Sequence, residues 1–113
     1  MKGYVVILVT VSSSEEAEKI AQSLVEGKLA ACVNIIPGLT SIFLWEGKID
    51  RAAEFLLVIK TREERMKEVI KTVKDLHSYR VPEIIALPIV SGSEDYLKWM
   101  DESTQVDRLK AED

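Results

Sequence analysis

The order of apolar and polar residues along the chain predicts strands and helices in alternation. Residues 4–11 are nearly all apolar and β-branched, which is typical of a buried strand. Residues 17–25 instead carry apolar side chains at intervals of three and four, the spacing of an amphipathic helix. Ser13 and Glu16 have capping-box spacing at its start. Gly27 is expected to end the helix in the left-handed conformation.

The middle of the chain predicts a strand followed by a long hairpin. Residues 29–36 form an apolar stretch, and a Pro-Gly pair at 37–38 is expected to break it. Residues 41–45 and 49–61 are the predicted arms of the hairpin, and residues 46–48 are its bend.

The second half predicts two more helices around one more strand. Residues 61–64 form a second capping box, and helical periodicity then continues to about Leu76. Residues 81–90 are a predicted strand, which must be an edge strand or bulged because Pro88 cannot donate to a ladder. Residues 94–103 are the predicted last helix.

This order is β-α-β-β-α-β with an extra C-terminal helix, the α+β ferredoxin-like pattern. Both crossover helices are expected on one face of the sheet, because connections between parallel strands are right-handed. The 113 residues make one domain, residues 1–113. The polar tail, residues 104–113, is expected to fray.

The predicted sheet is apolar on both faces, and its two crossover helices can cover only one. Residues 4–11, 54–60 and 84–89 each place apolar side chains on both sides of their strands. The last helix is too short to cover the rest. Because an uncovered apolar patch of this size marks an interaction surface, we expect a symmetric homo-oligomer.

Composition and charge narrow the class of protein further. The net charge of −4 gives no nucleic-acid footprint, and no apolar run approaches the length of a membrane span. We interpret the N-terminal apolar stretch as a strand and expect no targeting segment. A single cysteine excludes an intramolecular disulfide and favours a reducing, cytoplasmic location. Abundant Glu and Lys resemble the usage of heat-adapted, thermostable proteins.

Five stretches, in family order, together resemble the CutA divalent-cation tolerance family. They span nearly the whole chain, and their combination is specific although each alone is weak. They are ACVNI at 31–35, WEGKI at 45–49, IKT at 59–61, LHSYRVPEI at 76–84 and YLKW at 96–99.

The resemblance implies a ferredoxin-like fold assembled as a tight homotrimer and a role in tolerance to copper and other divalent metals. It implies no catalytic reaction, so the chain is not expected to be an enzyme. It also implies a polar set lining clefts between subunits: Asn34, Trp45, Glu54, Lys60, Tyr79 and Glu83.

Three positions depart from the family pattern. Phe43 and Leu44 stand where the family often has Tyr-Trp before Trp45. Ser78 replaces a proline, and Arg80 replaces an acid. The reversed charge at Arg80 puts in doubt any family site that uses that carboxylate.

Cys32 and His77 are the candidate metal ligands. Thiolate favours Cu(I), and neutral imidazole binds copper or zinc. Strand alternation turns Cys32 away from the apolar face that suits the helices. The structural alternatives are a small buried thiol and a histidine held near a helix C-terminus. Two ligands do not close a tetrahedral site, so others, such as Asp50 or Glu83, would come from assembly.

The functional alternatives differ in class. A regulatory trimer would bind a small anion or nucleotide in its clefts, although no Gly-rich phosphate loop is present. A scaffold trimer would bind an unknown protein partner and no small molecule. Glu54 and Lys60 share a face, which favours an ion pair across a subunit interface over acid–base catalysis.

Overall fold

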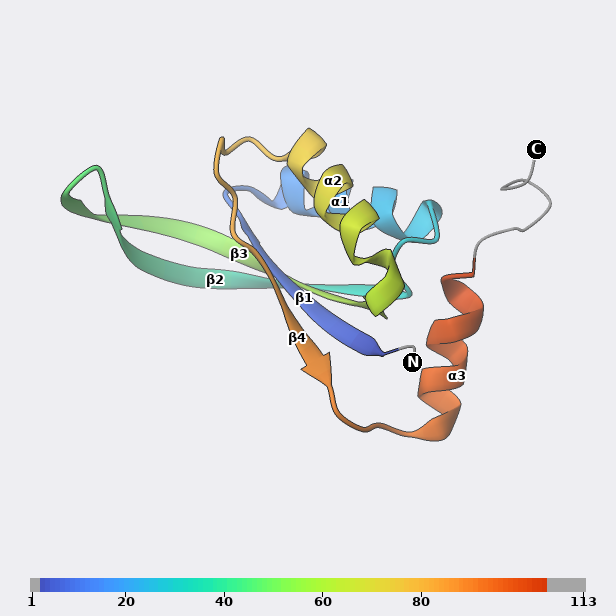
Figure 1. The fold of residues 1–113 in the computed structure, drawn as a ribbon. Coiled ribbons are helices and arrows are strands. Elements are labelled where there is room, and N and C mark those ends of the chain that lie inside the picture. The colour runs from blue at the N-terminus through green and yellow to red at the C-terminus, as the bar shows by residue number, and fades with distance from the viewer. Residues whose placement is uncertain (1–2, 106–113) are drawn as a thin grey trace.

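The computed structural model describes residues 3–105, which form a four-stranded sheet, three α-helices and one turn of 3-10 helix (Figure 1). The elements follow the predicted order and confirm the α+β class. They are β1 (Tyr4–Val11), α1 (Ser14–Glu26), β2 (Cys32–Trp45), β3 (Lys48–Arg62), η1 (Glu63–Arg65), α2 (Met66–Leu76), β4 (Ile84–Ile89) and α3 (Glu94–Ser103).

The strands lie in the order β2-β3-β1-β4, and neighbouring strands are antiparallel. Both α1 and α2 lie on one side of the sheet, as right-handed crossovers require (Figure 1). Strand β4 is an edge strand, so Pro88 sits where a missing N–H is tolerated. The observed strand is shorter than predicted, because residues 81–83 belong to the loop before it.

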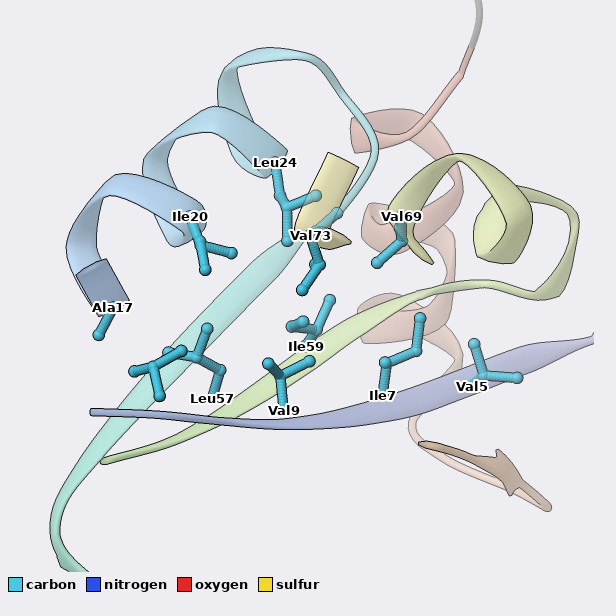
Figure 2. Close-up of a cluster of buried hydrophobic side chains, with 12 residues drawn as sticks. Val5, Ile7, Val9, Ala17, Ile20, Leu24, Leu57, Ile59, Val69 and Val73 are labelled. Carbon is cyan, nitrogen blue, oxygen red and sulfur yellow. The ribbon is translucent and has the colours of Figure 1, made fainter. Parts of the chain in front are cut away.

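The main core lies between the sheet and these two helices. Alternate residues of β1 and β3 point into it, and the apolar stripes of α1 and α2 close it from above (Figure 2). Its fully enclosed members include Ile7, Val9, Ile20, Leu24, Leu57, Ile59, Val69 and Val73.

The first helix begins as predicted but ends differently. Ser13 accepts a hydrogen bond from the backbone N–H of Glu16, which confirms the N-cap. Gly27 has an ordinary negative φ, and Lys28 takes the left-handed conformation at φ 59°. The Lys28 and Leu29 N–H groups donate to carbonyls of the last turn, a Schellman motif. Residues 29–31 are therefore bound to the helix end, and β2 begins later than predicted.

The second capping box is not formed. The Thr61 hydroxyl donates instead to the Leu29 carbonyl at 2.7 Å, inside the core. The chain then turns through η1 before α2 starts at Met66. Because the Thr61 side chain is committed to a neighbouring segment, it cannot cap its own helix.

Pro37 and Gly38 do not break the second strand, which runs through them with a β-bulge. The pairing steps from Ile36 opposite Leu56 to Leu39 opposite Glu54, so β2 holds one extra residue. Gly38 adopts φ 82°, which only glycine takes easily. The bulge changes which side chains point to which face of β2.

Helix α3 packs on the face of the sheet opposite α1 and α2, at one end. Tyr4 donates its phenol proton to Asp101 at 2.9 Å. Arg62 and Arg65 both donate to the Thr104 carbonyl at the end of this helix. Thr104 is buried, so the expected fraying does not begin there, and residues 106–113 lie outside the described part.

Candidate functional site

The hairpin of β2 and β3 extends beyond the helices, and we call residues 39–54 the arm (Figure 1). A cleft of about 680 Å³ lies between the arm and the loop that follows α2. Phe43 and Trp45 line it from β2, Asp50 and Glu54 from β3, and Tyr79 from the loop. Glu83 and both Arg51 and Arg80 complete its charged lining.

The bulge positions the aromatic side of this cleft. Antiparallel partners point to the same face, so Phe43 and Trp45 share a face with Asp50. Alternation along β3 puts Glu54 on that face as well. Without the extra residue at the bulge, alternation would turn both aromatic side chains to the other face.

Glu54 is the buried charged group of the cleft, at 6% exposure. The Tyr79 hydroxyl donates to its Oε2 atom at 2.8 Å. Burial, followed by this hydrogen bond, raises the pKa of Tyr79 to about 12. The phenol therefore stays protonated and remains a donor to the carboxylate across the physiological range.

His77 anchors the loop that carries Tyr79. Its Nε2 atom lies 2.7 Å from the Thr10 carbonyl, and the Tyr79 backbone N–H donates to its Nδ1 atom at 3.0 Å. Since Nδ1 accepts, Nε2 must be the donor, which fixes the neutral tautomer. Glu16 lies 3.3 Å from Nδ1 and also accepts two hydrogen bonds from Ser78. Both ring nitrogens are engaged, the arrangement expected of an anchoring histidine.

Cys32 lies in a different cluster, at the other end of the sheet. Its thiol is 3.9 Å from the Asn34 amide oxygen, which also accepts a hydrogen bond from the Lys60 ammonium. Burial and the nearby Cys32 thiol raise the pKa of Tyr96, a residue of α3. Cys32 is half-buried, so its thiol is open to an approaching ion.

Cys32 and His77 cannot bind one ion within a single chain. Cys32 is opposite Lys60, which is opposite Val6, whereas His77 contacts Thr10. Four residues along β1 separate these points, roughly 13 Å. No group of three or more potential ligands that could hold a metal occurs within residues 3–105.

The predicted cleft residues likewise fall into two groups. Trp45, Glu54, Tyr79 and Glu83 line the cleft, and Asn34 and Lys60 lie beside Cys32. The sequence reasoning did not include Tyr96 beside the thiol or Arg51 in the cleft. Contact between Tyr96 and Cys32 joins residues distant in sequence, and no local pattern signals it.

The described residues thus define a ferredoxin-like α+β domain with a protruding two-stranded arm and a charged, aromatic cleft at its base. A family model described as CutA1 divalent ion tolerance protein matches residues 5–103. The chain belongs to this family, as the five sequence stretches predicted.

Its relatives span distant organisms. A divalent-cation tolerance protein CutA of Thermus thermophilus is 52% identical over 99 residues, covering 88% of this chain and 96% of the relative. A protein CutA, chloroplastic, of Arabidopsis thaliana is 48% identical over 101 residues, covering 89% of this chain but 56% of the longer relative. The printed names describe tolerance to divalent cations and do not describe a reaction.

Solved structures match the fold closely. A divalent cation tolerance protein of Thermus thermophilus superposes with a TM-score of 0.89 at 50% identity, covering 90% of this chain and 99% of that one. CutA1 of Oryza sativa gives 0.90 at 47% identity, covering 93% and 96%. Within residues 3–105, no helix has both the length and the apolarity needed to cross a membrane.

Proposed function

We propose that this chain assembles as a homotrimer that serves tolerance to divalent cations by binding metal ions such as copper. We further propose that it acts in the cytoplasm and is not an enzyme. The observation that carries the proposal is an apolar sheet face without cover in the single chain. Family membership supports the role in cation tolerance.

The uncovered surface is the sheet face opposite α1 and α2, which we call the open face. Directly paired residues project from it on all four strands. Its outer members remain accessible, with Ile85 at 52%, Leu87 at 50% and Ile36 at 43% exposure. Helix α3 covers only one end. The open face comprises Val6, Leu8, Ile36, Leu56, Val58, Ile85 and Leu87.

The free edge of the sheet supports assembly in the same direction. Strand β2 is an edge strand of 14 residues. The arm adds Ile42, Leu44 and Ile49, which are paired or neighbouring apolar side chains at 60%, 71% and 78% exposure. Long edges with exposed apolar residues pair with other chains unless they are covered. A symmetric assembly of identical chains would cover the open face and this edge together.

Metal binding is proposed at Cys32. A thiolate is a soft ligand suited to Cu(I), and this thiol is accessible. His77 would have to give up one of its two ring contacts to bind a metal. Additional ligands would come from neighbouring chains, since one chain offers no three-ligand group within residues 3–105. The contact of the thiol with an amide rather than an imidazole supports a non-catalytic role.

A second candidate function is a regulatory trimer that binds a small ligand. The cleft favours this candidate, because its volume of about 680 Å³ falls in the usual range for small-molecule sites. Its aromatic walls and few charged groups have the composition of such sites. The two functions use separate parts of the molecule and can be tested separately.

Native mass spectrometry of the purified protein, with and without Cu(I) under reducing conditions, tests the metal proposal. Three chains of 12.7 kDa have a combined mass of about 38 kDa. We expect that mass, with integral copper uptake that Cys32→Ser abolishes and His77→Gln retains. Thr40→Ser, a change on exposed β2, is the matched control. A trimer that takes up no copper would contradict the metal role and favour the regulatory candidate.

A further inference from the structure

The cleft holds charges that are not paired with one another. Asp50, Arg51, Glu54, Arg80 and Glu83 all line it. Within residues 3–105, no ion pair joins any two of them. Four of these side chains belong to exposed residues and are solvated, whereas Glu54 is buried. Glu54 is therefore the group whose charge lacks both water and a counter-ion.

One oxygen of the Glu54 carboxylate is available to a ligand. Tyr79 donates to Oε2. Among the described residues, Oε1 takes part in no hydrogen bond, yet no fully enclosed side-chain oxygen there lacks a partner. The Oε1 atom therefore retains access to the cleft. A buried carboxylate with a free oxygen is best satisfied by a charged donor, such as an ammonium group.

Aromatic rings flank this oxygen. Phe43 and Trp45 line the cleft from the arm, and Tyr79 lines it from the loop. Aromatic faces favour a flat apolar group and also attract a cation. They supply apolar walls on both sides of the position that an ammonium on Glu54 would occupy.

Arg51 and Arg80 give the cleft an anion-binding side. Both belong to exposed residues, and guanidinium groups bind carboxylates through two parallel hydrogen bonds. Arg80 is the position where this chain departs from the acid usual in the family. A purely cationic ligand would meet two like charges here, and a purely anionic one would meet the buried Glu54.

We propose that the cleft binds a small zwitterion of the amino-acid class, with its ammonium on Glu54 Oε1, its carboxylate on Arg80 and its apolar side chain between the aromatic walls. This inference rests on the regulatory candidate of the proposed function and is independent of metal binding. Because the lining comes from one chain, each subunit carries a complete set of these contacts.

Isothermal titration calorimetry with three matched probes tests the proposal. L-phenylalanine carries both charges, 2-phenylethylamine carries only the ammonium, and 3-phenylpropionate carries only the carboxylate. We expect L-phenylalanine to bind at least about tenfold more tightly than either other probe, since each lacks one charge-assisted contact. Equal affinity for all three, or no binding by any, would overturn the proposal.

Two variants assign the charges. Glu54→Gln should weaken L-phenylalanine and 2-phenylethylamine by about tenfold and leave 3-phenylpropionate unchanged. Arg80→Gln, at an exposed position that does not affect folding, should weaken L-phenylalanine and 3-phenylpropionate instead. Glu18→Gln and Lys74→Gln, on the exposed sides of α1 and α2, are the matched controls.

The oligomeric mass of each variant separates this proposal from the trimer itself. If Glu54 pairs with a cation of another subunit, Glu54→Gln will change the mass and leave the probe affinities unchanged, which contradicts the ligand site. A trimer that binds no probe overturns the zwitterion site and leaves the assembly proposal intact. A monomer that binds L-phenylalanine with the expected selectivity supports the site and contradicts the assembly.

Discussion

Replacing Gly38 by alanine tests the structural role of the bulge in β2. Gly38 adopts φ 82°, and a Cβ atom added there would meet no atom within 4 Å. The cost of Gly38→Ala is therefore backbone strain alone, without a steric clash. Left-handed backbone costs a residue with a Cβ about 1–2 kcal/mol. Gly38→Asn should cost less, because asparagine tolerates this conformation.

The assay is guanidinium unfolding at a single protein concentration, since an oligomer's stability depends on concentration. With a denaturant slope of roughly 4 kcal/mol/M, a loss of about 1.5 kcal/mol lowers the midpoint by about 0.4 M. The matched control is Gly92→Ala, where no positive φ occurs and the nearest atom to a new Cβ is 3.5 Å away. Equal midpoints for the two alanine variants would refute the bulge geometry.

Three other predictions concern a pKa and two helix ends. Because the pKa of Tyr79 is raised to about 12, stability should fall as pH rises from 10 to 12, and Tyr79→Phe should remove that part of the loss in a pH series of unfolding curves. Lys28→Gly should stabilise the fold by about 1 kcal/mol in the same assay by relieving the left-handed lysine at the end of α1, and no gain would contradict the Schellman motif. Arg65→Met should speed amide hydrogen exchange in α3, because Arg65 donates to the Thr104 carbonyl at 2.9 Å, whereas unchanged exchange would show that this contact does not hold the helix.

Thermal stability is the remaining expectation from composition. The abundance of Glu and Lys predicts a thermal midpoint above the 45–65 °C or so of mesophile domains, measured by scanning calorimetry. A midpoint inside that range would contradict the interpretation of the composition.

Much of the fold follows from local sequence patterns. Apolar periodicity identified every strand and α-helix, because each element must bury one face or stripe. The Ser13 cap was legible because its partner, Glu16, lies three residues away. Elements whose partners are local were predicted well, and their ends were predicted least well.

The errors arose where a distant contact decided the local structure. Thr61 has a capping pattern, but its hydroxyl satisfies the Leu29 carbonyl, which is 32 residues away. Pro37 and Gly38 have the composition of a break, but pairing with β3 continues on both sides of them. Propensity gave way to tertiary pairing at both places.

The candidate site was predicted as a set of residues but not as a geometry. Family motifs marked Trp45, Glu54, Tyr79 and Glu83, and these do line one cleft. The separation of Cys32 from His77 depends on strand order and register, which spacing along the chain does not encode. The contact of Cys32 with Tyr96 depends on where α3 returns to the sheet.

Sedimentation equilibrium of the wild-type chain and one open-face variant tests the central claim most directly. The account predicts about 38 kDa for the wild type, three chains of 12.7 kDa. Ile85→Lys places a charge in the middle of the open face and should yield single chains of 12.7 kDa. Val90→Lys, at a position 93% exposed beyond β4, should remain at the wild-type mass. A wild-type mass of 12.7 kDa, or an Ile85→Lys variant as large as the wild type, would contradict assembly through the open face.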